Sequence, residues 1–161
     1  MSYFVENIDS VDVAILRELQ ADASRSVQEI ADVVGLSQNP CWRRIKRLES
    51  AGVIQHRVAI LDPVRLGRRL TVFVSIRTNR HNDEWLERFA EGVARIPEIV
   101  EIHRMSGDVD YLLKVIVADI AEYDRIYKLL ISAVDLSDVS SSFAMETIKS
   151  TTAIPLPQTA E

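Results

Sequence analysis

The chain has 161 residues, of which 47% are hydrophobic and 27% are charged, and its formal net charge is -5. This length suits one domain or two small domains with their own cores, and the net charge excludes a polycation that binds nucleic acid over its whole surface. One cysteine excludes an internal disulfide, three scattered histidines offer no zinc spacing, and no apolar run reaches the length of a membrane span. The N-terminus lacks the basic and apolar segments of a signal peptide. We therefore expect a cytoplasmic protein with no membrane partner, metal or cofactor.

Two short helices are predicted at the start of the chain. Asp9 is a typical N-cap residue, and apolar residues at helical spacing predict a helix over residues 10–21. Ser26 and, three residues later, Glu29 form the pattern of a capping box that opens a second, shorter helix. Gly35 ends that helix in the left-handed conformation that glycine tolerates.

A third helix follows at once and is the basic one. Ser37 is expected to cap it with its hydroxyl, and Pro40 is expected in the first turn, where its missing N–H costs nothing. Four of the five residues from Arg43 to Arg47 are cationic, and Cys41 lies on the apolar stripe, which favours a core position over a nucleophile. A solvated basic helix is the alternative, but a capped helix, a glycine turn and a second capped helix predict a helix-turn-helix unit.

The second helix of such a unit enters the major groove with its N-terminal part. Amides pair with adenine and arginine pairs with guanine, so four residues are predicted to reach base edges: Gln38, Asn39, Trp42 and Arg43. The remaining cations are predicted to hold phosphates, namely Arg44, Lys46, Arg47 and Arg57. Ser37 completes the predicted DNA-binding set, and packing of Trp42 against the first helix is the alternative to a base contact.

The rest of the chain predicts an α+β fold in two domains. The β-branched residues 53–60 predict a strand that closes an N-terminal domain of residues 1–62, and residues 63–69 form a linker with three arginines, solvated or touching DNA. Residues 70–161 form the second domain, with strands and helices over 70–78, 83–96, 98–106, 110–118, 119–134 and 138–149. This β-α-β-β-α-β order is that of the ferredoxin-like split unit. The tail after Thr151 is expected to be only partly ordered.

Motifs along nearly the whole length resemble the leucine-responsive/asparagine-responsive ("feast/famine") family of transcriptional regulators. The segments that carry the resemblance are Ile8-Asp9, Val34-Gly35-Leu36-Ser37, Pro40 to Glu49, Gly52-Val53-Ile54 and Gly107 to Leu113. The resemblance implies a winged or near-winged helix-turn-helix domain that a strand joins to an amino-acid-sensing domain. It also implies homodimers through the sheets that assemble into tetramers or octamers, bound to double-stranded DNA at the nucleoid.

The resemblance further implies that a small amino acid binds between subunits, near the turn Gly107 to Tyr111. Asp108 or Asp110 can pair with its ammonium, and backbone amides beside Gly107 can take its carboxylate. Met105 and Tyr111 complete the implied set. A plain hairpin turn at Gly107-Asp108 is the alternative. Similarity at Trp42-Arg43-Arg44, Arg77-Thr78 and Trp85 to the cysteine-responsive branch makes cysteine the first candidate effector.

Two rival classes share parts of this pattern. A small enzyme could use Asp108, Asp110 and His103 as acid/base groups, but no nucleophile–base spacing or phosphate loop supports it, so no catalytic residue is predicted. An architectural protein that packages DNA without an effector shares the DNA-binding domain, and a footprint would separate it from a regulator.

Overall fold

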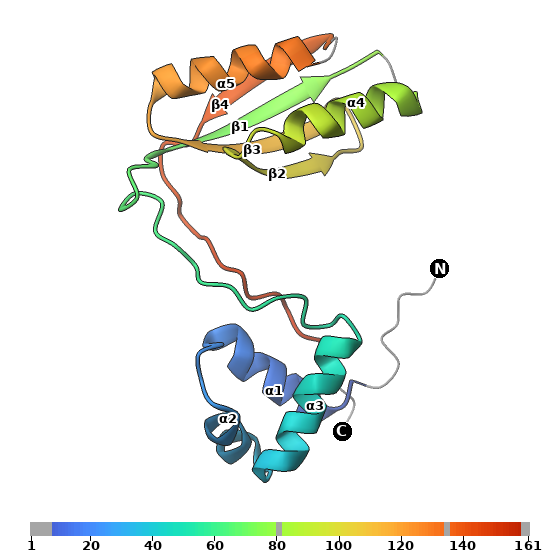
Figure 1. Ribbon diagram of the computed structural model, residues 1–161, viewed down its shortest axis with the longest axis vertical. Helices are drawn as coiled ribbons and strands as arrows, with labels where there is room; N and C mark the ends of the chain where they lie inside the picture. The colour runs from blue at the N-terminus through green and yellow to red at the C-terminus, as the bar shows by residue number, and fades with distance from the viewer. Residues whose placement is uncertain (1–7, 80–81, 134–135, 159–161) are drawn as a thin grey trace. The chain divides into compact units, whose positions relative to one another are not determined.

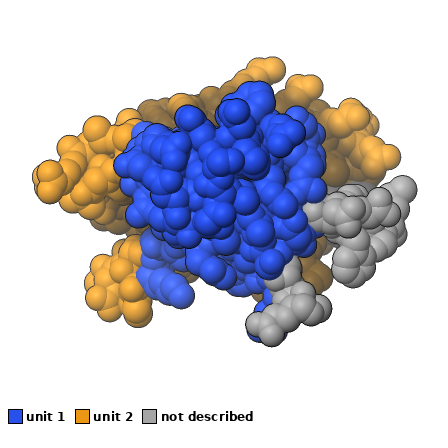
Figure 2. Space-filling view, turned by 90° about the horizontal axis from the view of Figure 1, so that it is seen from below, with its two compact units in different colours: residues 1–60, 149–161 blue, residues 61–148 orange. Residues whose placement is uncertain are grey.

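The computed structural model describes residues 8–79, 82–133 and 136–158, and the chain folds as two compact units (Figure 1). Unit 1 comprises Met1–Ile60 and Lys149–Glu161, and unit 2 comprises Leu61–Ile148 (Figure 2). This division differs from the expected boundary, which placed all of residues 70–161 in the second domain. Among the described residues, no helix has the length and apolar character that a membrane crossing requires.

Unit 1 begins with three helices, α1 (Ser10–Ala21), α2 (Val27–Val34) and α3 (Gln38–Ser50). The expected caps of the first two are confirmed. At α1 the amide of Asp12 donates to the Asp9 carboxylate at 2.9 Å, and the amide of Asp9 donates back to the Asp12 carboxylate at 3.1 Å. At α2 Ser26 and Glu29 form the predicted box. Two reciprocal bonds satisfy amides that a helix start leaves unpaired.

The turn between α2 and α3 agrees with the sequence in one respect and differs in another. Gly35 has φ 71°, the left-handed conformation expected of it. Ser37 is the N-cap of α3, but its hydroxyl makes no capping hydrogen bond, so that part of the prediction is wrong. The usual donors to a capping side chain are the second and third helical amides. Pro40 occupies the third position and has no N–H.

One apolar cluster holds the three helices together. Its buried members are Ile15, Leu16, Ile30, Ala31, Cys41, Ile45 and Leu48. Each helix contributes one stripe, as the periodicity predicted. Full burial of aliphatic side chains stabilises such a unit by about 1.5–3 kcal/mol per residue. The opposite side of α3 is therefore left to face outward.

The strand predicted over residues 53–60 is wrong, because these residues form no strand. The amides of Val53 and Ile54 both donate to the carbonyl of Leu48, at 3.0 and 3.2 Å, and so close the end of α3. Further on, Val58 and Ile60 are each 71% exposed. A strand needs a neighbour for its backbone groups, and the four-stranded sheet of the described residues includes no strand from residues 53–60. No wing follows the helix-turn-helix in the part of the chain that the structure describes.

Unit 2 has the predicted β-α-β-β-α-β order. Its elements are β1 (Leu70–Arg77), α4 (Asp83–Ala94), β2 (Ile99–Arg104), β3 (Tyr111–Val117), α5 (Ile120–Ala133) and β4 (Asp138–Phe143). The strands pair antiparallel in the order β2-β3-β1-β4, and both helices cover the same face of the sheet (Figure 1). β3 is central, as its apolar residues on both faces predicted.

The helix-covered face of the sheet carries the core of unit 2. Val72, Val74 and Ile76 of β1 are at most 1% exposed and alternate with residues of the other face. Trp85 and Phe89 of α4 stack at 5.0 Å between ring centroids, and the Tyr111 ring lies 4.9 Å from that of Phe89. These aromatic contacts fix α4 over the start of β3.

The C-terminal tail returns to unit 1 and packs against α1. The Gln20 side-chain amide bonds both backbone groups of Ile154, accepting from its N–H at 2.7 Å and donating to its carbonyl at 3.2 Å. Leu156 is partly buried against the apolar cluster of unit 1. The tail is thus an ordered part of the helix-turn-helix unit through residue 156, whereas the sequence led us to expect only partial order.

Truncation of Leu156 to alanine should loosen unit 1. Losing a partly buried isopropyl group should cost about 1 kcal/mol, which corresponds to roughly fivefold faster hydrogen exchange in α1. Hydrogen exchange of the full-length chain, read by mass spectrometry on α1 peptides, measures this. Ile154→Ala is the matched control, because that side chain is 68% exposed and its backbone bonds to Gln20 remain. Equal exchange in both variants would contradict the packing role of Leu156.

Candidate nucleic-acid interface and ligand-binding turn

The outward side of α3 carries the residues predicted to reach bases. Gln38, Asn39 and Arg43 are exposed, and Trp42 is 49% exposed. Packing within unit 1 therefore accounts for only about half of the indole surface. Cys41 lies on the buried stripe, and burial raises the pKa of its thiol, which disfavours the reactive thiolate.

Two of the cations predicted to hold phosphates are held by carboxylates of α1. Arg44 donates to Asp9 at 2.6 Å and to Asp12 at 2.9 Å, and Arg47 donates to the other oxygen of Asp12. The Asp12 side chain is 0% exposed. Hydrogen bonding to Asp9 raises the pKa of the Arg44 guanidinium, and the amide of Asp12 lowers the pKa of Asp9. We did not predict this network from the sequence, in which the only signal for it was the pair of aspartates, Asp9 and Asp12, at the start of α1.

A second carboxylate holds the other two predicted phosphate-binding cations. Glu49 accepts from Lys46 at 2.7 Å and from Arg57 at 2.9 Å. The Lys46 ammonium, as the larger effect, lowers the pKa of Glu49. Both cations remain partly exposed, at 55% and 37% of their side-chain surface, so each keeps donors that face water.

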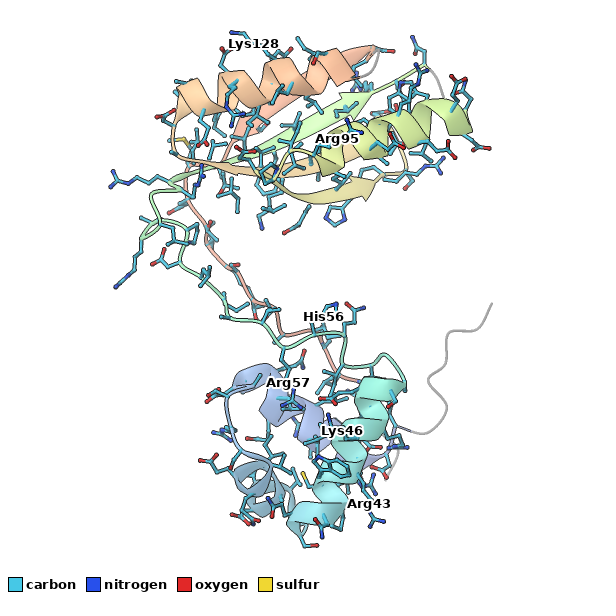
Figure 3. All side chains as sticks on the ribbon, in the orientation of Figure 1. Arg43, Lys46, His56, Arg57, Arg95 and Lys128 are labelled. Carbon is cyan, nitrogen blue, oxygen red and sulfur yellow. The ribbon has the colours of Figure 1, made fainter. Side chains whose placement is uncertain are left out.

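Arg43 differs from the other three cations of α3 because it forms no ion pair with the described residues. It extends from the outward side of the helix (Figure 3). Arg43 also lines an open concavity of about 690 Å³ on unit 1, together with Ile8, Asp9, Pro40, Arg44 and Arg47. Three guanidinium groups around one concavity favour an anionic partner.

The glycine turn lies between β2 and β3. Gly107 has φ 110°, which favours glycine, and the turn closes through the amide of Met105, which donates to the Asp110 carbonyl at 2.8 Å. From the end of β1, Arg77 donates to the carbonyl of Asp108 at 2.7 Å. Antiparallel pairing of β1 with β3 brings Arg77 next to the turn. We did not predict this contact from the sequence.

The five residues expected to bind an amino acid have different surroundings. Met105, Gly107 and Asp108 are exposed on the turn. The Asp110 carboxylate instead accepts from the amide of Thr78 at 2.8 Å, and the Tyr111 ring, 6% exposed, lies in the core beneath α4. Structural roles thus occupy Asp110 and Tyr111 in the single chain.

Two of the three groups of the enzyme alternative, His103 and Asp110, have structural partners. The His103 imidazole lies 3.3 Å from the Glu101 carboxylate, and Asp110 binds a backbone amide. Hydrogen bonding to Lys114, more than to His103, lowers the pKa of Glu101. Within the described residues, no three His, Cys, Asp or Glu side chains converge as a metal site.

Comparison with known proteins finds two family models that together match most of the chain. Residues 8–49 match the AsnC-type helix-turn-helix domain, and residues 71–154 match the Lrp/AsnC ligand binding domain. A curated relative is the glutamate uptake regulatory protein of Zymomonas mobilis, 48% identical over 98% of this chain and 96% of its own length.

Two solved structures are also similar over the whole fold. The crystal structure of an AsnC family transcriptional regulator from Agrobacterium tumefaciens is 57% identical, with a TM-score of 0.88 over 92% of this chain and 97% of that one. A transcriptional regulator from Neisseria meningitidis, crystallised in complex with L-methionine, is 32% identical, with the same TM-score and coverage.

Proposed function

The chain belongs to the Lrp/AsnC family of DNA-binding transcriptional regulators, and on that premise we propose that α3 recognises an operator through its exposed N-terminal half. The single observation that carries this proposal is the division of α3 into a buried stripe and an exposed stripe that holds Gln38, Asn39, Trp42 and Arg43. The first residues of a recognition helix lie nearest to base edges in the major groove. The side-chain amides match adenine, and Arg43 matches guanine.

The flanking cations would hold the DNA backbone. Because the net charge of the chain is -5, affinity for DNA must come from the local cations of α3 and Arg57. We propose that Arg44, Lys46, Arg47 and Arg57 contact phosphates through the donors that their carboxylate partners leave open. The Ser37 hydroxyl, which makes no capping hydrogen bond, would donate to a phosphate at the start of the helix. Chromosomal DNA as the partner would place the protein at the nucleoid, in the cytoplasm.

Replacing Arg43 with alanine should weaken operator binding by about 1–3 kcal/mol, or roughly five- to 150-fold, and relax the preference at one base pair. Fluorescence anisotropy on a duplex selected by the wild-type protein from random-sequence DNA measures both effects. Arg17→Ala is the matched control, because it removes an exposed arginine of α1 from the same unit. Equal losses of affinity in the two variants would show a general charge effect instead of base contact.

A footprint of the wild-type chain on DNA separates the regulator from the packaging alternative. A continuous footprint, in place of a spaced dyad, would favour packaging.

The turn between β2 and β3 would bind a small amino acid. Asp108 is exposed and forms no hydrogen bond through its carboxylate in the described residues, so we propose that it pairs with the ammonium of the effector. Backbone amides around Gly107 would take the effector carboxylate. The Arg77 contact holds the carbonyl of Asp108 in place. Met105, exposed beside the turn, would contact the effector side chain, and Asp110 and Tyr111 would support the turn from behind. The L-methionine complex of the Neisseria relative supports this ligand class, and cysteine is our first candidate.

Asp108→Asn should weaken binding of the effector at least about tenfold, because a neutral amide replaces the partner of the ammonium. Isothermal titration of the twenty amino acids against the wild-type chain identifies the ligand, and the variant is then titrated with that ligand. Asp83→Asn removes an equal charge from the exposed start of α4 and serves as the control. Absence of heat with all twenty would overturn the effector proposal and leave an architectural role.

The uncovered face of the sheet would form a homodimer interface. α4 and α5 cover one face only, and the other face carries Phe73, 38% exposed, with half-buried Leu112, Lys114 and Ile116 beside it. Apolar residues on an open sheet face favour a partner sheet. We propose that two copies pair through this face and that dimers assemble further into tetramers or octamers. Dimerisation would present two recognition helices to two half-sites of one operator.

Phe73→Asp should shift the chain from dimer to monomer at micromolar concentration, because a charge would be buried at the paired face. Size-exclusion chromatography with light scattering measures the mass directly. Leu86→Asp is the matched control, since Leu86 has a similar exposure of 36% but lies on α4. A wild-type chain that elutes as a monomer would contradict the dimer proposal, and so would an unaltered oligomer in the Phe73 variant.

A further inference from the structure

Asp12 carries a fully buried carboxylate, with 0% of its surface exposed. A buried carboxylate is costly unless it is paired and hydrogen-bonded. Its two oxygens accept from Arg44 at 2.9 Å, from Arg47, and from the amide of Asp9 at 3.1 Å. No buried side-chain polar atom in the described residues lacks a partner. The carboxylate is therefore satisfied largely by the two arginines of α3.

This arrangement limits what Arg44 and Arg47 can give to DNA. Each guanidinium has five N–H donors, so each can still reach a phosphate with a donor that Asp12 leaves open. However, the carboxylate compensates their charge, and a phosphate that pulled either arginine away would leave Asp12 buried and unpaired. Such a loss costs more than a surface contact gains. Sequence-independent attraction to phosphate depends on uncompensated cations, and Asp12 reduces that attraction.

The same contacts also orient the recognition helix. Arg44 and Arg47 lie one turn apart on α3, and both reach the first turn of α1, where Asp9 and Asp12 also form the capping box. Two charged contacts on one side of α3 restrain its rotation about its own axis. Arg43 lies on the same concavity but is outside this restraint. Rotation of α3 decides which side chains face the base edges.

We propose that Asp12 is a specificity-determining positioning residue for DNA recognition: it withholds Arg44 and Arg47 from indiscriminate phosphate binding and fixes the face of α3 that meets the bases. This inference rests on the proposed DNA-binding role of α3. It assigns to a buried acidic residue an effect on discrimination between sequences. A purely structural cap would instead lower affinity for every duplex together with stability.

The test is Asp12→Asn in the full-length chain, which keeps the side-chain shape and removes the charge. Binding is measured to a duplex selected by the wild-type chain and to a shuffled duplex of the same composition, between about 50 and 200 mM salt. The variant should bind the shuffled duplex more tightly. Its plot of log affinity against log salt should steepen by about one to two units, since each phosphate contact that Arg44 or Arg47 gains beyond those of the wild-type chain adds about 0.9. The ratio of selected to shuffled affinity should fall at least about tenfold.

Two further variants keep the result decisive. Asp9→Asn retains an N-cap residue of equal quality and removes one partner of Arg44, so it should shift the slope and the ratio in the same direction by a smaller amount. Glu87→Gln makes the same change in net charge on unit 2, at an exposed position of α4, and should leave both unchanged. If Asp12→Asn does not fold, Asp9→Asn decides the outcome.

Several outcomes would overturn the inference. One is a salt slope that is unchanged or shallower in the aspartate variants. Another is a ratio that stays constant while both affinities fall. An equal change of salt slope and affinity ratio in Glu87→Gln would show that the effect comes from net charge alone. Failure of the wild-type chain to prefer any duplex would instead overturn the proposed function itself, so the two failures are distinguishable.

Discussion

The buried carboxylate of Asp12 connects the start of α1 to the middle of α3, and the exposed surface of unit 1 depends on that connection. The apolar cluster that includes Ile15, Ile45 and Leu48 packs α3 onto α1. Apolar contacts are not directional, so they define the rotation of α3 about its own axis only loosely. Charged, directional bonds from Arg44 and Arg47 define it sharply. α3 therefore carries two kinds of cation. Arg44, Lys46 and Arg47 are paired with carboxylates, and Arg43 extends outward.

In unit 2 the sheet and the turn at Gly107 are directly connected. Its sheet has one face covered by α4 and α5 and another face left open (Figure 1). The turn at Gly107 lies where β2 meets β3, and the end of β1 supports it through Arg77 and the Thr78 amide. Since β1 and β3 are the two inner strands, a ligand at this turn would act directly on the centre of the sheet. The inner strands are closely packed on both sides, so a displacement of these strands would be transmitted to the rest of the sheet.

Helix spacing, caps and strand alternation were sufficient to predict the order of elements in both units, because these depend on neighbours along the chain. The prediction was wrong for the strand over residues 53–60 and did not include the carboxylate partners of Arg44 and Arg47, and both features depend on segments far away in sequence. Residues 53–60 have the composition of a strand but no paired neighbour. The charges on Arg44 and Arg47 were visible, yet their link to Asp12 spans more than thirty residues. One local contribution to the missing cap at Ser37 is visible in the sequence, since Pro40 at the third helical position has no amide to donate.

The return of the tail to α1 means that unit 1 is encoded in two separate pieces. Ribosomes release the piece with α1, α2 and α3 first, then all of unit 2, and only afterwards the segment with Leu156. The nascent chain therefore contains α3 before it contains Leu156, a residue that packs against the same apolar cluster. A polypeptide that ends early through stalled translation would possess every helix of unit 1 and still lack the segment that completes it.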